Sequence, residues 1–300
     1  MSRSVVFASF KADSADFDFT YTLEDENLLR EPLRQRGVEV ATRAWDDPAV
    51  DWASYDAVII RSTWDYHHRY AQYLAWLAGL EAQGARLFNP LPMLRWNMDK
   101  TYLGTLPGYG IRTLPTVFLR QGETLDLAAV LRDHGWERAV VKPTVSAGGD
   151  NTWRFSAAEL PAAQARLDEQ TQQMAVMIQQ YADQIADGEW SFLFFNGVYS
   201  HAVRKVPANG DMFVHMHRGG TTAAAEPTPA LVAQASNIVR IAERINGSLP
   251  LYARVDTVIE GETLTLMELE LLEPYLYMPY ADRWAAERLA DAIALRLEEA

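Results

Sequence analysis

Arg254-Val-Asp256 and Glu268-Leu-Glu270 are the stretches that decide the fold of this 300-residue chain. Residues two apart in a strand point to the same face, so the pattern predicts two strands that carry one cation and three carboxylates on one face. The turn Glu260-Gly261-Glu262 would join them as a hairpin. Three carboxylates repel one another unless a cation lies between them, and Mg²⁺ needs few carboxylates when phosphate and water complete its shell. The hairpin therefore indicates a metal-nucleotide site, and a solvated hairpin with a charged face is the alternative.

A second pattern lies upstream, where the apolar run 139–141 leads into Lys142-Pro143 and then into a loop of small residues that contains Gly148-Gly149. Such a loop lets backbone N–H groups approach an anion while the lysine supplies a positive charge, which suits a triphosphate. Neither G-x-x-x-x-G-K-[ST] nor G-x-G-x-x-G after a strand occurs in the sequence. An ordinary turn with a surface lysine is the alternative.

Together with further motifs, these patterns resemble the ATP-grasp superfamily, in order, over the last two-thirds of the chain. The motifs are Lys142-Pro with Ser146-Ala-Gly-Gly149, Gly188-Glu189-Trp-Ser191, Arg204-Lys205, Arg254-Val-Asp256 and MELELLEP at 267–274. The first third adds Trp45-Asp-Asp-Pro48, RSTWDY at 61–66, Asn89-Pro90 and RWNMDK at 95–100. With this set the chain is similar to the cyclo-ligases of cycloserine biosynthesis, which close O-ureido-D-serine into a ring.

The resemblance implies ATP and Mg²⁺ as cofactors and gives each motif a role. ATP would be bound by Lys100, Lys142, Ser146, Gly148, Gly149, Gln180, Tyr181, Asp183 and Glu189. Mg²⁺ would be held by Asp256, Glu268 and Glu270, and the catalytic cations would be Arg204, Lys205 and Arg254. The family usually has asparagine where Glu270 stands, so whether Glu270 binds the same metal ion, a second metal ion or a substrate amine is open.

The periodicity of the first hundred residues predicts a small α/β domain. Apolar strands at 5–10, 38–44, 55–60 and 87–90, with helices at 24–35 and 68–83, are typical of a largely parallel sheet. Ligands bind beyond the carboxyl ends of strands in such sheets. The substrate candidates at these ends are Arg61, Ser62, Thr63, Trp64, Asp65 and Asn89. Helix capping by Ser62 or Thr63 and core packing of Trp64 are the alternatives.

The rest of the chain predicts the two subdomains of an ATP-grasp fold, with α+β character in the C-terminal lobe. We place the N-terminal α/β domain at 1–98 and the subdomains at 99–185 and 186–300. Helices are expected near 99–103, 125–134, 160–170, 230–244 and 283–298, and strands at 116–119, 174–178, 190–195 and 198–204. The stretch 221–225 is expected to be a loop.

Composition excludes several classes of protein. The net charge of −13 without a basic cluster argues against nucleic-acid binding. The chain lacks cysteine, which removes disulfides and thiolate chemistry, and we expect neither His67-His68 nor His215-Met-His217 to bind a metal ion. No apolar run approaches the length of a membrane span, so a cytoplasmic protein is expected. The partner would be a small amino-acid-like molecule, and a homo-oligomer is left open.

These inferences favour a ligase that phosphorylates a carboxylate and lets a nitrogen displace the phosphate. Closure within one molecule, as in the cyclo-ligases, is our first hypothesis. A ligase that joins two molecules is the second, and a nucleotide-binding protein without turnover is the third.

Overall fold

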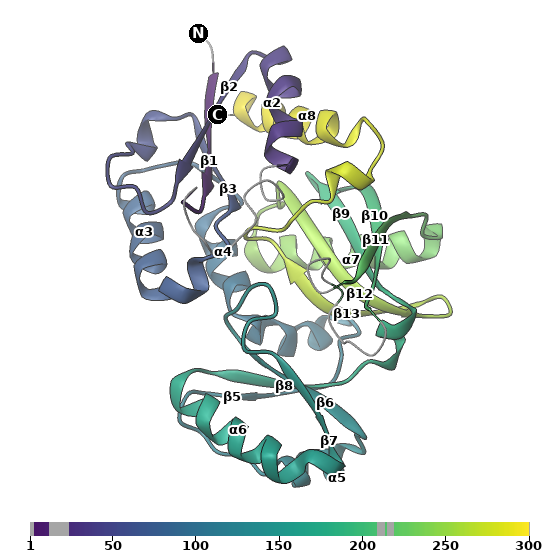
Figure 1. The fold of residues 1–300 in the computed structure, drawn as a ribbon. Helices are drawn as coiled ribbons and strands as arrows, with labels where there is room; N and C mark the ends of the chain where they lie inside the picture. The colour runs from purple at the N-terminus through teal and green to yellow at the C-terminus, as the bar shows by residue number, and fades with distance from the viewer. Residues whose placement is uncertain (1–2, 12–23, 209–213, 215–218, 300) are drawn as a thin grey trace.

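The computed structural model describes residues 3–11, 24–208, 214 and 219–299. Figure 1 shows three sheets that follow one another along the chain, with the second sheet standing apart from the other two. Their strand orders are β2-β1-β3-β4, β5-β8-β6-β7 and β11-β10-β9-β12-β13. The first is parallel and the other two are antiparallel, which confirms the expected N-terminal parallel sheet and ATP-grasp fold.

The N-terminal sheet is doubly wound, because its apolar strands bury both faces. Val5 and Phe7 pack with the helix α2, whereas Val6 and Ala8 pack with α3. The strands are β1 (Arg3–Ser9), β2 (Val38–Ala44), β3 (Ala57–Ser62) and β4 (Leu87–Phe88), and the helices are α2 (Glu24–Gln35) and α3 (Tyr70–Ala82). The predicted elements of this domain are thus confirmed, with ends displaced by a few residues.

The second sheet carries the lysine strand and the glycine loop. Leu127, Leu131 and Leu167 of α5 and α6 pack with Val141 and Ile178 of the sheet in one apolar cluster. The strands are β5 (Thr116–Leu119), β6 (Arg138–Pro143), β7 (Trp153–Ser156) and β8 (Val176–Gln180), and the helices are α5 (Leu127–His134) and α6 (Leu160–Gln173).

The third sheet divides its two faces between packing and chemistry. Ala253 and Val255 lie in the apolar cluster that α7 covers, so Arg254 and Asp256 between and beside them point to the opposite face. The strands are β9 (Glu189–Phe195), β10 (Val198–Val206), β11 (Thr221–Ala225), β12 (Tyr252–Glu260) and β13 (Thr263–Glu270), and the helix is α7 (Pro229–Asn246).

The last helix, α8 (Ala285–Glu298), brings the C-terminal part of the chain against the N-terminal domain. It packs against α2 and also contacts β9 and β10, and Figure 1 shows it beside α2 near the N-terminus. Leu289 and Ile293 of α8 share an apolar cluster with Leu29 of α2 and Phe195 of β9. The first and third sheets are therefore bridged by one core, and the boundaries at 98 and 185 stay a proposal.

Side chains from the segment that follows β4 cover the outer edge of β13. The Asn97 amide donates to Leu269 O at 2.7 Å and accepts from Leu271 N at 2.7 Å. The Tyr102 hydroxyl accepts from Leu269 N and donates to Leu269 O, each at 2.8 Å. Asn89 donates to Leu271 O at 2.7 Å. These bonds replace a further strand and fix the backbone on which Glu268 and Glu270 stand.

Two expectations about local structure are wrong. The stretch 221–225, expected as a loop, is strand β11, paired antiparallel with β10. The helix expected near 99–103 is a 3-10 helix (Lys100–Gly104), and an α-helix that the sequence analysis did not place, α4 (Leu91–Met98), precedes it. Within the described part of the chain, none of the helices combines the length and apolar character that a bilayer crossing needs.

Candidate active site

The hairpin β12–β13 places its four charged residues as the sequence predicted. Arg254 is paired with Glu270, and Asp256 with Glu268, across the two strands. Ser191 of β9 stands opposite Asp256 on the other side of β12. One cation and three carboxylates thus occupy one face of β12 and β13, with Ser191 beside them on β9.

Asp256 is the most heavily bonded carboxylate of this group. It accepts from Arg254 Nη2 at 2.9 Å and from the Ser191 hydroxyl, and Lys205 Nζ lies 3.5 Å away. Burial would raise the pKa of Asp256, but Arg254 and then Lys205 hold that pKa down to about 2. Asp256 is therefore charged at any physiological pH.

Glu270 has the opposite electrostatic character. It contacts Arg254, yet burial raises the pKa of its carboxyl to about 7, and the neighbouring carboxylates of Glu268 and Asp256 add to the rise. Crowded carboxylates of this kind lose their repulsion when a dication lies among them. Hard oxygen donors suit Mg²⁺, and the chain would hold it through Asp256, Glu268 and Glu270, although the oxygens of these three described carboxylates do not all lie within 4.8 Å of one another.

Lys100 connects this acidic group to the glycine loop. Its Nζ lies 3.3 Å from Glu268 and donates to Ser146 O at 2.7 Å, while its backbone N donates to Thr144 O at 2.8 Å. Lys142 lies on β6 and is close enough to feel the same charges. Burial lowers the pKa of Lys142, the charge of Glu268 raises this pKa, and the charge of Lys100 lowers it. The structure thus brings together the two predicted phosphate lysines and the predicted metal ligands.

The loop after Lys142 needs its glycines. Gly148 and Gly149 have φ of 62° and 75°, in the left-handed region that side chains with a Cβ rarely adopt. The consecutive left-handed residues turn the chain back toward β7, as the prediction of a small-residue loop requires.

Gln180 and Tyr181, which are predicted to bind ATP, are the last residue of β8 and the residue after it. The N–H groups of Gln180 and Tyr181 donate to Pro115 O and Arg138 O at 2.9 and 3.1 Å. Adenine would therefore have to be read by backbone groups other than these two donors. Asp183 is exposed and pairs with Arg138, whereas Glu189 is buried more deeply and pairs with Lys205. A role for Asp183 or Glu189 on the ribose stays a prediction.

Lys205 reaches the site and Arg204 does not. Successive residues of a strand point to opposite faces. Lys205 is 4% exposed and contacts Glu189 and Asp256, whereas Arg204 is exposed and donates to Asp187 O beside Gly188. The expectation that both side chains act on the transferred group is therefore corrected for Arg204.

The substrate candidates of the N-terminal domain are bonded within the protein. Arg61 is 2% exposed, lies 3.6 and 3.5 Å from Asp25 and Glu26, and donates to Pro274 O at 3.2 Å. The Ser62 hydroxyl donates to Glu26 at 2.7 Å. Both residues lie inside β3 rather than beyond its end, which explains their burial.

The other members of this set divide between packing and the site. Thr63 contacts the Tyr73 hydroxyl at 3.0 Å, and Asp65 accepts from Trp45 Nε1 at 2.8 Å. Trp64 Nε1 donates to Glu273 O at 2.8 Å, close to the acidic group. Asn89 is fully buried, and its amide bonds three backbone groups, so the structure does not bring it to the site. Substrate contact by Arg61, Ser62, Thr63, Trp64 and Asp65 stays a prediction.

Two residues of the site were missed by the sequence analysis. The Tyr277 ring lies 5.7 Å from Lys205 Nζ and 5.6 Å from the Arg254 guanidinium carbon, within reach of cation–π contact. Glu273 is buried, and burial followed by the charge of Glu270 raises its pKa to about 8. The run of acids and tyrosines at 268–280 was the available signal.

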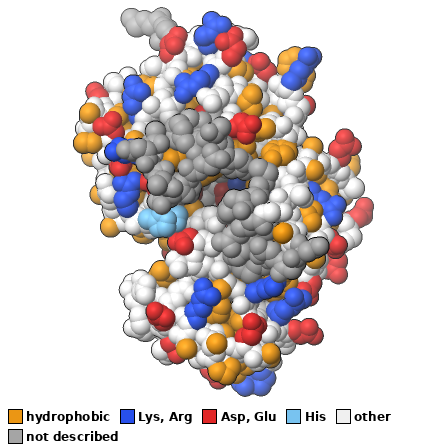
Figure 2. All heavy atoms as spheres, in the orientation of Figure 1, with side chains coloured by type: hydrophobic (Ala, Val, Ile, Leu, Met, Phe, Trp, Pro, Cys, Tyr) orange, Lys and Arg blue, Asp and Glu red, His pale blue; other side chains and the backbone are white. Residues whose placement is uncertain are grey.

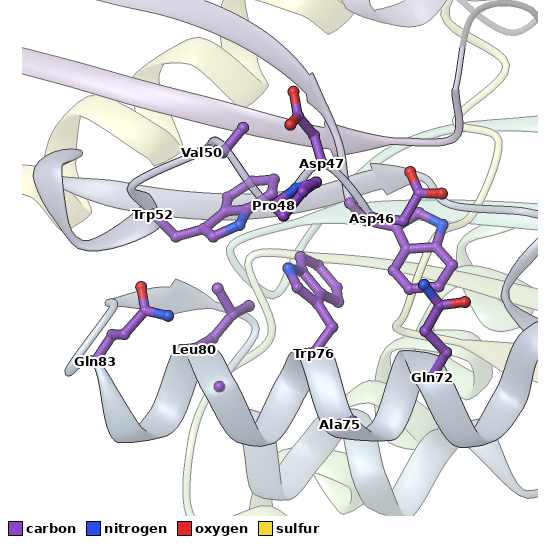
Figure 3. Close-up of a pocket in the computed structure, with 12 residues that line it drawn as sticks. Asp46, Asp47, Pro48, Val50, Trp52, Gln72, Ala75, Trp76, Leu80 and Gln83 are labelled. Carbon is purple, nitrogen blue, oxygen red and sulfur yellow. The ribbon is translucent and has the colours of Figure 1, made fainter.

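A separate cavity of about 320 Å³ lies in the N-terminal domain, away from these charges. Figure 3 shows Trp52 facing Trp76 of α3 in this cavity, and Asp46 and Asp47 also line the cavity. None of the predicted site residues lines this cavity. Figure 2 shows the face of the molecule hollowed near its centre, with basic and acidic side chains visible in the hollow.

The three sheets, with lysines on two of them facing a carboxylate hairpin, define an ATP-grasp ligase. The family model for the N-terminal domain of D-cycloserine synthetase DcsG matches residues 5–89, and that for the ATP-grasp domain of prokaryotic glutathione synthetase matches 114–260. A solved structure of the same fold, ATP-grasp ligase PsnB, contains Mg and ADP, at a TM-score of 0.63 and 17% identity.

The full-length comparisons narrow the class. Cycloserine biosynthesis protein DcsG of Streptomyces lavendulae is 32% identical over 284 residues, covering 90% of this chain and 93% of that protein. The crystal structure of D-cycloserine synthetase DcsG superposes with a TM-score of 0.86 at 28% identity, covering 98% and 99% of the two chains. D-alanine–D-alanine ligase of Bacillus anthracis, in complex with ATP, shares the fold at a TM-score of 0.72 and 18% identity, with 100% and 99% covered. The chain belongs to the DcsG family.

Proposed function

We propose that this ligase activates the carboxylate of O-ureido-D-serine and closes the molecule on itself to give D-cycloserine. The observation that carries the proposal is the joint presence of the phosphate lysines and the crowded acid group around Glu270 in a chain related to DcsG over nearly its whole length. A nucleotide-binding protein without turnover would have no use for this arrangement.

The reaction would proceed in two steps. A carboxylate oxygen of the substrate attacks the γ-phosphorus of ATP, so that ADP leaves and an acylphosphate forms. A nitrogen of the same molecule then attacks the acyl carbon, and phosphate leaves with the electron pair of the broken C–O bond. Water then removes the carbamoyl group that this nitrogen still carries, as carbon dioxide and ammonia, which gives D-cycloserine. Because nucleophile and electrophile belong to one molecule, the site mainly has to fold the substrate and exclude water.

The cations of the site would do most of the electrostatic work. Lys100 and Lys142 would bind the α- and β-phosphates under the loop 146–149, and Lys205 with Arg254 would balance the charge of the transferred phosphoryl group and the substrate carboxylate. Asp256, Glu268 and Glu270 would hold Mg²⁺, which would neutralise negative charge on the phosphates when bound. A cytoplasmic location and a homo-oligomeric state remain predictions.

An intermolecular ligase is the alternative, since the model of the glutathione synthetase ATP-grasp domain also matches this chain. The two reactions differ in what they consume. A cyclo-ligase needs one organic substrate, because its nucleophile is tethered to the carboxylate. An intermolecular ligase needs a second amine.

The test is ADP release with O-ureidoserine as the only organic substrate, together with the mass of the product. We expect ADP and phosphate in equal amounts, and faster turnover for the D than for the L enantiomer. The Lys142→Ala variant serves as the control for contaminating ATPase. ADP release that requires a second amine, with a product mass equal to both substrates less water, would replace this proposal with the intermolecular one.

A further inference from the structure

Two histidines and an aspartate join the glycine loop to the N-terminal domain. His67 and His68 lie on a 3-10 helix (Tyr66–Arg69) that precedes α3, and Asp150 follows Gly149 in the loop. His67 Nε2 lies 3.7 Å from Asp150 Oδ2, and His68 Nδ1 lies 4.0 Å from the same oxygen. One donor atom from each residue lies within 4.8 Å of the other two. Figure 2 shows histidine side chains on this face, beside an acidic side chain.

The His67 side chain is mostly buried, with the Trp64 backbone as a weak hydrogen-bond partner. The side chain is 7% exposed, and neither ring nitrogen makes a hydrogen bond of normal geometry to a described residue. The 3.7 Å separation from Asp150 is too long for one. A buried polar atom left unpaired is costly, so its retention in this position points to a partner.

The spacing is close to that of a metal centre. A tetrahedral zinc ion with bonds of about 2.0–2.1 Å separates its ligand atoms by roughly 3.3 Å. The separations of 3.7 and 4.0 Å from Asp150 would therefore have to shorten by about 0.4 and 0.7 Å, and the histidine atoms, which lie within 4.8 Å of one another, would have to reach the same spacing. The side chains of His68 and Asp150 are 51% and 41% exposed, which gives an ion a path and leaves a coordination position for water.

We propose that His67, His68 and Asp150 form a second metal site, for a dication of the zinc type, which ties the glycine loop to the N-terminal domain. Imidazole nitrogens select this class of ion, whereas Mg²⁺ prefers the all-carboxylate group around Asp256. The loop already lies against the N-terminal domain, since Val145 and Ala147 pack on its apolar cluster. An ion at this site holds the loop closed and slows its opening.

Binding is tested by titrating the full-length protein with Zn²⁺ against a chromophoric chelator, and with Co²⁺ as an absorbing substitute, in excess Mg²⁺ so that the carboxylate group is occupied. We expect one equivalent to bind to the wild type. His68→Ala and Asp150→Asn, both at partly exposed positions, should weaken binding at least about tenfold. The double variant His215→Ala/His217→Ala, which removes the other close histidine pair, should bind as the wild type does.

Equal affinity in the wild type and in His68→Ala overturns the proposal, as does binding that is lost only in the His215/His217 double variant. The link to the loop has its own readout. Zn²⁺ should slow hydrogen exchange of the backbone at 144–152 in the wild type and leave it unchanged in His68→Ala. Exchange that does not respond to Zn²⁺ in the wild type refutes the closing role.

Discussion

Asp256 holds three different donors at once, a guanidinium, an ammonium and a hydroxyl. Asp256 therefore holds the side chains of Arg254 and Lys205 in their orientations before any substrate binds. Catalysis of phosphoryl transfer depends mainly on charge that is in place beforehand. The residues around Asp256 should therefore affect turnover more than folding.

Substitution of the charged residues tests this at once. We expect Lys142→Ala and Asp256→Asn each to remain folded by circular dichroism and to lower kcat/KM by about a hundredfold or more. ADP release is the measurement. Arg204→Ala is the matched control, because Arg204 is a neighbour of Lys205 on the other face of β10 and should cost less than about threefold. A folded Lys142→Ala variant with full activity would remove Lys142 from the site.

His201 makes stability depend on pH. Burial lowers the pKa of His201 from 6.5 to about 4, although Nε2 lies 2.9 Å from Leu276 O. The folded ring resists protonation that the unfolded chain accepts, so stability is complete above pH 6.5 and falls by about 3 kcal/mol as the pH drops to 4. In His201→Gln the unfolding free energy should fall less over this range. Exposed His134→Gln is the control, and an equal slope in all three proteins contradicts the assignment.

The glycine loop and the β12–β13 turn offer a matched pair of backbones. Gly148 and Gly261 have φ of 62° and 61°, and an added Cβ meets no atom within 4 Å at either position. Alanine therefore costs about 1–2 kcal/mol of backbone strain at both. We expect Gly148→Ala to raise the KM for ATP severalfold and Gly261→Ala to leave it unchanged. Equal KM values in both variants would mean that the loop does not cover the phosphates.

Asn89 links the end of β4 to the third sheet. Its amide bonds Tyr252 O, Leu271 O and Leu251 N at 3.1, 2.7 and 2.6 Å. Asn89→Ala leaves buried backbone groups unpaired, so we expect a loss of about 2–4 kcal/mol in denaturant unfolding with an unchanged KM for the organic substrate. Asn246→Ala, which removes one bond within α7, should cost less than about 1 kcal/mol. A raised KM with unchanged stability would restore Asn89 to the substrate site.

Helices and strands with a clear periodic pattern of apolar residues were predictable from the sequence. Elements whose form depends on tertiary contacts were not. α2 shows the helical apolar period, and β3 a continuous apolar run. β11 consists of threonine and alanine only and gains its form from pairing with β10. α4 has only eight residues, with prolines at positions 90 and 92 around its start, so its pattern was too brief to predict a helix.

The site shows the same division. The hairpin register follows from alternation alone, which is why Arg254, Asp256, Glu268 and Glu270 were placed correctly on one face. Arg204 was misplaced because a motif was carried over as a pair, although neighbours in a strand diverge. The contact of Asp150 with His67 joins segments far apart in sequence, so no local sequence pattern could predict that these two residues lie together.

At the scale of the whole molecule, α8 contributes to the core that is shared by the first and third sheets. Ile293 is fully buried in the cluster that contains residues of the first and third sheets, whereas Leu295 of the same helix is 47% exposed. We expect Ile293→Ala to lower the unfolding free energy by about 2–4 kcal/mol and Leu295→Ala by less than about 0.5 kcal/mol.

The thermal unfolding transition of Ile293→Ala also tests whether the first and third sheets unfold together. Since one core bridges the two sheets, thermal unfolding followed by tryptophan fluorescence and by circular dichroism should give coincident curves. Separate transitions would mean that residues 1–98 unfold independently of residues 186–300.

The side chains that cover β13 also bear on how the protein behaves at high concentration. A strand at the border of a sheet offers its backbone to any other chain and can seed intermolecular pairing and aggregation. At Leu269 and Leu271 that backbone is already occupied by Asn97, Tyr102 and Asn89. The opposite border, β11, has no such cover among its described hydrogen bonds. Among the described residues, β11 is therefore the border of the catalytic sheet that is more open to strand addition, and a proline there would protect against it.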